Sequence, residues 1–502
     1  MTRLFLGFAS ACAIAIGGPL VLLAQAPQSA SADIELQLGD LLMNEARFRD
    51  AQESYRRAIA ASHEDAAMER QARSGLVMAL LRTGDFTGSH AEALRLVSDN
   101  PQDGHAHALL GDTLWGLGRF DEAEEAYDTA LKDDIGDARA HHGRAAILTA
   151  RNRFAEALVE AQQASKLAPR EPEFHHTIGV IYERQHRFDE AAVVFGNYVN
   201  LLPNRDHSEK AMWTRAEIRF LDSFKGLAPV DFSASGATTT WTVPIRIDKD
   251  KVFVRLKING AGPMEFVLDT GAEQTVVSRD LARKRGILPI TYMPSAGVGD
   301  IGFRGLQIGR IDSIEIGDLK VKNVPCLIKN PPLGEIPGRE PDSFSPLALG
   351  LSMRVDYARR QLVIARELPR EPHATELPLW LYRLATVRGT VNGQPTTFVV
   401  DTGGEAISIS QTTAGNVTIP PGFRKIPLKV YGTSGWDKDA FLMPSVDLEF
   451  SSIRFSKIPV VVLNLRAPSA LLGYELGGIV GHKFLSKYRV SIDLQRSVVG
   501  LD

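Results

Sequence analysis

The sequence predicts a multidomain protein in which an all-α solenoid of helical hairpins precedes an all-β unit made of two lobes. Three observations predict this: a 34-residue period in the first 200 residues, alternating apolar and polar residues after Gly226, and a duplication in which the triplet Asp-Thr-Gly occurs twice. A chain of 502 residues is also too long for one hydrophobic core.

The composition is that of an ordinary globular protein, with 44% hydrophobic and 23% charged residues and a net charge of -3. No long basic block is present, which argues against nucleic-acid binding and against a polybasic membrane patch. Cys12 and Cys326 are the two cysteines, and their spacing matches no zinc motif. We therefore expect no metal and no cofactor, and Cys326 as a buried small hydrophobe.

Residues 1–32 have the parts of a secretory signal. Arg3 precedes an apolar run from Leu4 to Ala24, and small residues follow at Ala30-Ser31-Ala32. The sequence thus predicts an exported protein, periplasmic or secreted. The alternative is an uncleaved N-terminal membrane anchor, because about 20 apolar residues can span a bilayer.

Residues 33–205 carry the repeat, read as about five helical hairpins. Small or apolar residues recur at one position, and a phenylalanine follows nine residues later. The recurring residues are Gly39, Val77, Gly111, Ala145 and Gly179, followed by Phe48, Phe86, Phe120, Phe154 and Phe188. Small residues allow the two helices of a hairpin to approach closely, and the aromatics fill the gap between hairpins.

This segment resembles the tetratricopeptide repeat family, which implies a concave surface that holds a protein segment. The alternative is a spacer, since a fold alone does not define a function. Two His-His pairs, 141–142 and 175–176, lie one repeat apart. Repetition of an ordinary surface pattern explains them better than a metal site. Residues 206–240 are read as a capping helix (212–224) and a linker.

Two β segments follow, 241–370 and 371–502, and each contains the same series of elements. In the first, a strand at 252–258 meets the turn signal Asn259-Gly260, and a returning strand ends at Asp269-Thr270-Gly271. In the second, a strand at 386–391 meets Asn392-Gly393, and its returning strand ends at Asp401-Thr402-Gly403. The two triplets lie 132 residues apart, which indicates an internal duplication.

These residues resemble the aspartic peptidases, in particular their retropepsin-like bacterial members. The resemblance covers the apolar run into Asp-Thr-Gly, a later apolar pair followed by Gly350 or Gly481, and a closing hairpin. It implies one carboxylate per lobe, Asp269 and Asp401, sharing a water and a proton. The ionised carboxylate activates the water and the protonated one donates to the substrate carbonyl. Which aspartate acts as acid and which as base stays open at this stage.

The resemblance also assigns supporting roles. Thr270 and Thr402 would hydrogen-bond across the lobe interface, while Gly271 and Gly403 would let the backbone pass close to the carboxylates. Two glycine-rich stretches, 296–300 and 430–435, are the candidate flaps that cover an extended peptide. The candidate substrate-binding residues there are Gly297, Val298, Gly299, Tyr431, Gly432 and Thr433. Asp300 and Asp437, near the flap tips, are expected in solvent.

The halves also differ. Gly404 and Glu405 follow the second triplet, with Glu405 expected to point outward, and a short helix at 482–488 has no counterpart in the first half. The sequence therefore predicts an exported aspartic endopeptidase whose repeat domain recruits a substrate or a partner protein. The alternatives are a non-catalytic peptide-binding scaffold and lobes that pair with those of another chain. The substrate and the oligomeric state stay open.

Overall fold

The structure is a computed structural model that describes residues 28–62, 65–300, 302, 304–329, 342–417 and 425–502. Most of the predicted signal segment lies outside the described residues, although the first helix begins at Gln28, within the range assigned to that segment. None of the described helices is long and apolar enough to cross a membrane.

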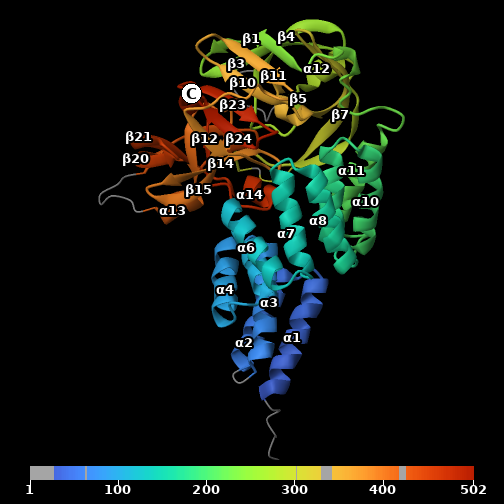
Figure 1. The fold of residues 1–502 in the computed structure, drawn as a ribbon, viewed down its shortest axis with the longest axis vertical. Helices are drawn as coiled ribbons and strands as arrows, with labels where there is room; N and C mark the ends of the chain where they lie inside the picture. The colour runs from blue at the N-terminus through green and yellow to red at the C-terminus, as the bar shows by residue number, and fades with distance from the viewer. Residues whose placement is uncertain (1–27, 63–64, 301, 303, 330–341, 418–424) are drawn as a thin grey trace, which may run out of the picture.

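The N-terminal part is a stack of antiparallel helix pairs that rises from the bottom of the view toward the lobes and ends in one extra helix (Figure 1). The predicted phenylalanines each begin the second helix of a pair. The helices are α1 (Gln28–Asn44), α2 (Phe48–Ala61), α3 (Ala66–Thr83), α4 (Phe86–Asp99), α5 (Gly104–Gly116), α6 (Phe120–Asp133), α7 (Ala138–Ala150), α8 (Phe154–Leu167), α9 (Pro172–Arg184), α10 (Phe188–Leu201) and α11 (Glu209–Asp222).

Small residues let these helices approach, as the period predicts. A Cβ on Gly111 would lie 2.5 Å from the Tyr127 ring, and one on Gly179 would lie 2.5 Å from the Phe195 ring. Aspartate side chains cap several first helices. Asp103 accepts a hydrogen bond from the backbone N–H of Ala106, which satisfies an otherwise unpaired donor at the start of α5.

The first lobe is built on an eight-stranded sheet of order β2-β3-β4-β9-β5-β8-β7-β6 among the described residues. Its elements are β2 (Arg246–Asp248), β3 (Lys251–Ile258), β4 (Ala261–Leu268), β5 (Thr275–Val277), α12 (Arg279–Lys284), β6 (Pro289–Ser295), β7 (Arg304–Ile316), β8 (Leu319–Ile328) and β9 (Ser343–Phe344), with 3-10 turns at Ser233–Ser235 before the lobe and Pro346–Leu349 after β9.

The second lobe repeats this order as β13-β14-β15-β22-β16-β21-β20-β17, which supports the predicted duplication. Its elements are β13 (Trp380–Leu381), β14 (Ala385–Val391), β15 (Gln394–Val400), β16 (Ile407–Ser410), α13 (Gln411–Asn416), β17 (Ile426–Pro427), β18 (Val430–Gly432), β19 (Gly435–Asp437), β20 (Phe441–Phe450), β21 (Ile453–Leu463), α14 (Arg466–Leu472), β22 (Gly478–Val480) and α15 (His482–Leu485).

A six-stranded sheet joins the lobes, and its order β1-β11-β10-β23-β24-β12 is symmetric about its centre. The strands are β1 (Thr240–Pro244), β10 (Ser352–Asp356), β11 (Gln361–Ala365), β12 (Thr375–Pro378), β23 (Arg489–Asp493) and β24 (Val498–Leu501). The central pair β10–β23 is antiparallel and contains one strand from each half. The lobes therefore face each other across an approximate twofold axis.

The two predicted hairpin turns form as expected. Asn259 and Gly260 have φ values of 49° and 75°, and Asn392 and Gly393 have 48° and 79°. A positive φ at both turn residues defines the turn type that Asn-Gly favours between twisted strands. Each turn thus sends its strand back toward the centre of the molecule, where the aspartates lie.

The repeat array packs directly against the lobes (Figure 1). The Thr397 hydroxyl donates to the Gly118 carbonyl at 2.6 Å, and Arg388 pairs with Glu122 at 2.8 Å. One apolar cluster contains buried residues of both parts, namely Leu114, Phe120, Ala123, Ala126, Tyr127, Ile147, Ala150, Trp380, Val399, Ala440, Leu463, Leu465, Leu472, Tyr474 and Leu476. At the other end α11 lies against β6.

Candidate active site

Asp269 and Asp401 occupy equivalent places, each at the residue after a buried strand. Asp269 follows β4 and donates its backbone N–H to Phe344 at 2.9 Å, while Asp401 follows β15 and donates to Val480 at 3.1 Å. Because β4 and β15 run toward the twofold axis, the side chains meet there and are hydrogen-bonded to each other. The predicted pair is thus brought together within one chain.

The two threonines form a reciprocal set of hydrogen bonds beneath the pair. The backbone N–H of Thr270 donates to Oγ1 of Thr402 at 3.1 Å, and the N–H of Thr402 donates to Oγ1 of Thr270 at 3.0 Å. Each hydroxyl then donates to the opposite lobe, to the carbonyls of Val400 (2.5 Å) and Leu268 (2.8 Å). Both side chains are buried, so the four bonds hold the two loops at a fixed separation.

The glycines fit where the resemblance placed them. A Cβ on Gly271 would lie 2.6 Å from Cγ of Asp401, and one on Gly403 would lie 2.7 Å from Cγ of Asp269. Such contacts are closer than a real Cβ tolerates, so only glycine allows each loop to pass under the opposite carboxylate.

The backbone donors are unequal on the two sides. Asp269 Oδ1 accepts one N–H, from Gly271 at 3.1 Å. Asp401 Oδ1 accepts two, from Gly403 and Gly404, both at 2.9 Å. A Cβ on Gly404 would crowd Oδ2 of Asp401 at 2.7 Å. Gly404, which the sequence marked only as a difference between the halves, thus brings an extra donor to Asp401.

Burial and mutual repulsion change the titration of both carboxyls. Burial, followed by the charge of Asp401, raises the pKa of Asp269 from 3.8 to about 7, although hydrogen bonds from the Ser343 hydroxyl and the Gly271 N–H oppose that rise. Burial also raises the pKa of Asp401, but the hydrogen bonds from Gly404 and Gly403 oppose that rise. Because the two carboxyls are hydrogen-bonded to each other, they cannot both be ionised, and the pair holds one proton near neutral pH.

The candidate flaps meet over the pair. The backbone N–H of Gly297 donates to the Ser434 hydroxyl at 2.9 Å, and the N–H of Ser434 donates to the Val298 carbonyl at 2.9 Å. The backbone N–H of Asp300 donates to the Trp436 carbonyl at 2.9 Å. The β6–β7 connection of the first lobe and the β18–β19 hairpin of the second are therefore joined at their tips.

Five of the six flap residues predicted from sequence line the cavity below: Gly297, Val298, Tyr431, Gly432 and Thr433. Gly299 does not line it. Its backbone packs instead on the second flap, at a φ of 132°. The expectation that Asp437 is solvated is wrong, because its buried carboxylate accepts the N–H of Asp439 (3.1 Å) and of Asn464 (2.8 Å) and so braces the hairpin.

The aspartates lie in a cavity of about 1780 Å³ that the repeat array helps to enclose. Both lobes line it, and so do α9 and α11. This volume exceeds that of small-molecule pockets, which are roughly 300–1,000 Å³, and leaves room for a peptide segment. Residues of the repeat array thus line the same cavity as the aspartates.

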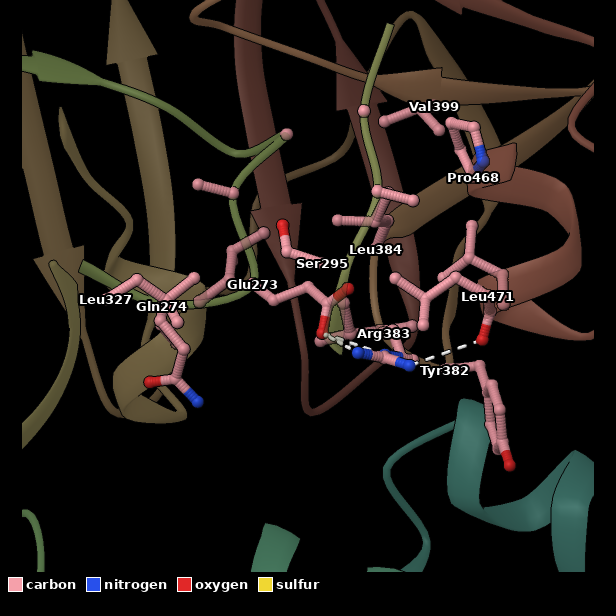
Figure 2. Close-up of a pocket in the computed structure, with 18 of the residues that line it drawn as sticks. Glu273, Gln274, Ser295, Leu327, Tyr382, Arg383, Leu384, Val399, Pro468 and Leu471 are labelled. Atoms are coloured by element: carbon pink, nitrogen blue, oxygen red, sulfur yellow. Dashed lines mark hydrogen bonds and ion pairs between the residues drawn. The ribbon is translucent and has the colours of Figure 1, made fainter. Parts of the chain in front are cut away.

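Two ion pairs across the lobes were missed at the sequence level. Glu273 and Arg383 are 2.8 Å apart, with Arg383 also donating to the Leu471 carbonyl at 3.3 Å (Figure 2). Glu405 and Lys251 are 3.6 Å apart. In each lobe the acid lies four residues after the aspartate of that lobe, and the base lies 18 residues before it. This repeated spacing could have revealed the two pairs.

The histidine pairs fill ordinary structural roles. His142 Nε2 lies 2.9 Å from Oγ1 of Thr177, and the His176 ring packs on Phe195 and Tyr198. Within the described parts of the chain, no group of three His, Cys, Asp or Glu residues is placed to hold a metal ion.

Family models match both parts of the chain. The tetratricopeptide repeat model matches residues 36–104, 74–138 and 108–172. The aspartyl protease model matches 254–352, and the gag-polyprotein putative aspartyl protease model matches 387–476. The chain therefore combines tetratricopeptide repeats with two domains of the aspartyl protease type, one in each lobe.

The solved structures that resemble the chain are repeat proteins. One is a thermophilic tetratricopeptide protein of Thermus thermophilus (18% identity, 37% of this chain and 98% of that one, TM-score 0.32). Another is pilF of Pseudomonas aeruginosa (12% identity, 40% of this chain and 99% of that one, TM-score 0.29). A third is YrrB, described as having an unusual peptide-binding site (16% identity, 37% of this chain and 91% of that one, TM-score 0.23). All three TM-scores are below 0.5, so the assignment of the chain to these families rests on the family models alone. Curated proteins gave no match.

Proposed function

We propose that this protein is an exported aspartic endopeptidase that hydrolyses peptide bonds with a water activated between Asp269 and Asp401. The observation that carries the proposal is the pair itself: two hydrogen-bonded carboxyls, one from each lobe, held by reciprocal threonine bonds inside a peptide-sized cavity. The matches to aspartyl protease models in both lobes support it.

The unequal donors give the carboxyls different roles in the resting enzyme. Asp401 accepts two backbone N–H groups, which favour its ionised form. Asp269 accepts one backbone N–H and the Ser343 hydroxyl, yet burial and the charge of Asp401 still raise its pKa to about 7. Asp401 therefore acts as the general base that takes a proton from water. Asp269 acts as the general acid that donates to the substrate carbonyl, and the roles reverse when the leaving nitrogen is protonated.

The flaps bind the peptide from the other side. An extended peptide between the flaps and the aspartates pairs with exposed backbone groups, as a strand added to a sheet does. Substrate entry then requires the flap tips to separate, which breaks the bonds of Ser434 to Gly297 and Val298.

The test is to incubate the full chain with a peptide library from pH 3 to 7 and to identify the products by mass spectrometry. The proposal predicts new internal peptide termini, and inhibition by a peptide in which a secondary alcohol replaces the scissile amide, because that group mimics the tetrahedral intermediate. Intact peptides at every pH would overturn it.

A peptide-binding scaffold without turnover is the second candidate. The observation that favours it is the closed cover, since the flap tips are bonded to each other and the repeat array encloses the cavity. A scaffold would bind library peptides and release them uncut, whereas a peptidase would release fragments.

Export rests on residues 1–32 and is tested by locating the protein in cell fractions and sequencing its N-terminus. The proposal predicts protein outside the cytoplasm that begins near residue 33, or one that starts at Met1 and stays with the membrane. Full-length protein in the cytoplasm would contradict both forms.

A further inference from the structure

The two ends of the cavity are related by the approximate twofold axis but differ in what surrounds them. At one end the pair Glu273–Arg383 is about one-third exposed (30% and 33% of the side chains). At the other end the side chain of Lys251 is 30% exposed and that of its partner Glu405 is 57% exposed, so the two ends differ at the acid. The repeat array contacts the chain next to Arg383, at the first of these ends.

The repeat array reaches the first end through α9. Arg184, near the end of that helix, donates to the backbone carbonyls of Leu381 (2.9 Å) and Tyr382 (3.1 Å), next to Arg383. Tyr382 in turn points toward the helices and packs edge-on against Trp115 at 5.1 Å (Figure 2). The bonds of Arg184 hold the end of α9 beside the Glu273–Arg383 pair, where α9 lines the cavity.

Helices α9 and α11 each bring a carboxyl group to the cavity, Glu183 and Glu217. Both line the cavity, and their side chains are hydrogen-bonded to each other. Burial raises the pKa of both, and the charge of Glu183 raises that of Glu217 further. The two groups therefore share a proton, as the catalytic pair does.

The other acids of the cavity that belong to the repeat array already have partners. Glu173 binds Arg82 and Lys210, Glu156 binds Arg153, and Glu209 accepts the indole N–H of Trp213. Among the described residues, neither Glu183 nor Glu217 forms an ion pair with a base.

The nearby cations are also engaged. Arg383 is held by Glu273 and the Leu471 carbonyl, and Arg184 by two carbonyls and Asn152. Arg383 and Arg184 influence the titration of Glu183 but do not form an ion pair with it. The carboxyl pair thus faces a peptide-sized space, continuous with the catalytic aspartates, with no side-chain cation bound to it.

We propose that the repeat array supplies a substrate subsite in which Glu183 and Glu217 bind a cationic group of the peptide held at Asp269 and Asp401. The cation is a lysine or arginine side chain or a free amino terminus. On binding, the shared proton is released to solvent, and the cation donates charge-assisted hydrogen bonds to the two carboxylates. The repeat array then selects the residue bound in the active site. The inference rests on the proposed peptidase function.

The experiment uses the full chain and a randomised peptide library, prepared with free and with acetylated amino termini. Cleavage products are sequenced for the wild type, for Glu183→Gln, Glu217→Gln and the double variant, and for Glu190→Gln, an exposed acid on α10 as the matched control. Glutamine resembles the protonated acid that the pair already contains, so the variants should fold, which melting curves check.

We expect the wild type and Glu190→Gln to cut at a fixed distance from a cation, and the double variant to lose this preference by about tenfold, equal to about 1.4 kcal/mol. If the preference is lost in the acetylated library, the group bound by the subsite is a free amino terminus. If the preference persists there, the bound group is a lysine or arginine side chain. The same preference in the double variant and the wild type would overturn the subsite.

A second readout separates the two claims. The wild type and the double variant are each immobilised, and the peptides that each one captures from the same library are identified. This measurement does not require cleavage. Enrichment of cationic peptides by the wild type alone supports the subsite even if nothing is cut, in which case only the peptidase proposal falls. Equal enrichment by both proteins overturns the subsite.

Discussion

At the scale of single residues, small differences between duplicated loops separate two chemically identical side chains. Asp269 and Asp401 both follow an apolar strand and precede Thr-Gly, yet the backbone N–H of Gly404 reaches only Asp401. That donor exists because Gly404 leaves space where a Cβ would crowd the carboxylate. The Gly404 donor therefore favours the proton on Asp269, whereas the hydrogen bond from the Ser343 hydroxyl to Asp269 acts in the opposite direction.

The proton on Asp269 makes stability depend on pH. Below about pH 4 the carboxyl is protonated in both the folded and the unfolded chain, so it contributes nothing to the pH dependence. As pH rises from about 4 to about 7, the unfolded chain releases the proton that the folded protein retains. The free energy of unfolding contributed by Asp269 therefore falls over this range.

We predict that Asp269→Asn loses less stability than the wild type between pH 4 and 7, because asparagine carries no proton to release. Thermal melting of both proteins at several pH values measures the difference. Asp280→Asn, a change at an exposed side chain, serves as the control and should follow the wild type. Parallel curves for Asp269→Asn and the wild type would show that the pKa of Asp269 is not raised.

At the scale of elements, the sequence correctly predicted those features, such as tight turns, whose conformation depends on residues adjacent in the chain. Asn259-Gly260 and Asn392-Gly393 formed the expected turns because the Asn-Gly preference is local. The role of Asp437 was wrong for the opposite reason. Its partner Asn464 lies 27 residues away, and no local pattern shows that a carboxylate braces a hairpin from inside. The helix predicted at 482–488 is shorter in the structure, His482–Leu485.

The contact between the flap tips gives a prediction for Gly299. An alanine there would place its Cβ against the Ser434 carbonyl and would have to hold a φ of 132°, so the tips should separate. We expect Gly299→Ala to lower kcat/KM for peptide cleavage by about tenfold or more.

Gly302→Ala is the matched control, because Gly302 also has a positive φ of 71° but a Cβ there would meet nothing within 4 Å. Steady-state kinetics of the two variants compare the effects. If Gly299→Ala cleaves as well as Gly302→Ala, contact between the flaps plays no part in substrate binding.

At the scale of the whole molecule, the sequence predicted the separate parts but not their arrangement. The period of 34 residues and the duplicated lobes were readable because each repeats itself. The packing of one part on the other depends on pairs such as Arg388 and Glu122, which lie 266 residues apart. Phe120 and Trp380 resemble ordinary core residues in sequence. Consequently the repeat array was expected to recruit substrate, and its place in the cavity wall was not foreseen.

The interface gives a prediction for Phe120, whose ring lies 5.0 Å from Tyr474 and 5.5 Å from Trp380 in the second lobe. Removing a buried phenylalanine ring costs about 3–5 kcal/mol. We expect Phe120→Ala to destabilise the protein by this amount and to separate the unfolding of the array from that of the lobes in calorimetry.

Phe48→Ala changes the equivalent position of the first repeat, where the ring is only partly buried and outside the shared cluster. It should cost less and leave the number of transitions unchanged. Equal costs for the two variants would show that the array does not depend on the lobes.

The shared use of Asp269 and Asp401 is tested most directly by comparing peptide cleavage by the wild type, Asp269→Asn and Asp401→Asn from pH 3 to 7. We predict that each variant loses at least about 100-fold in kcat, because each lacks one partner in proton transfer, while the melting temperatures stay high enough for assay at 25 °C. Cleavage at the wild-type rate by either variant would remove the carboxyl pair from the mechanism.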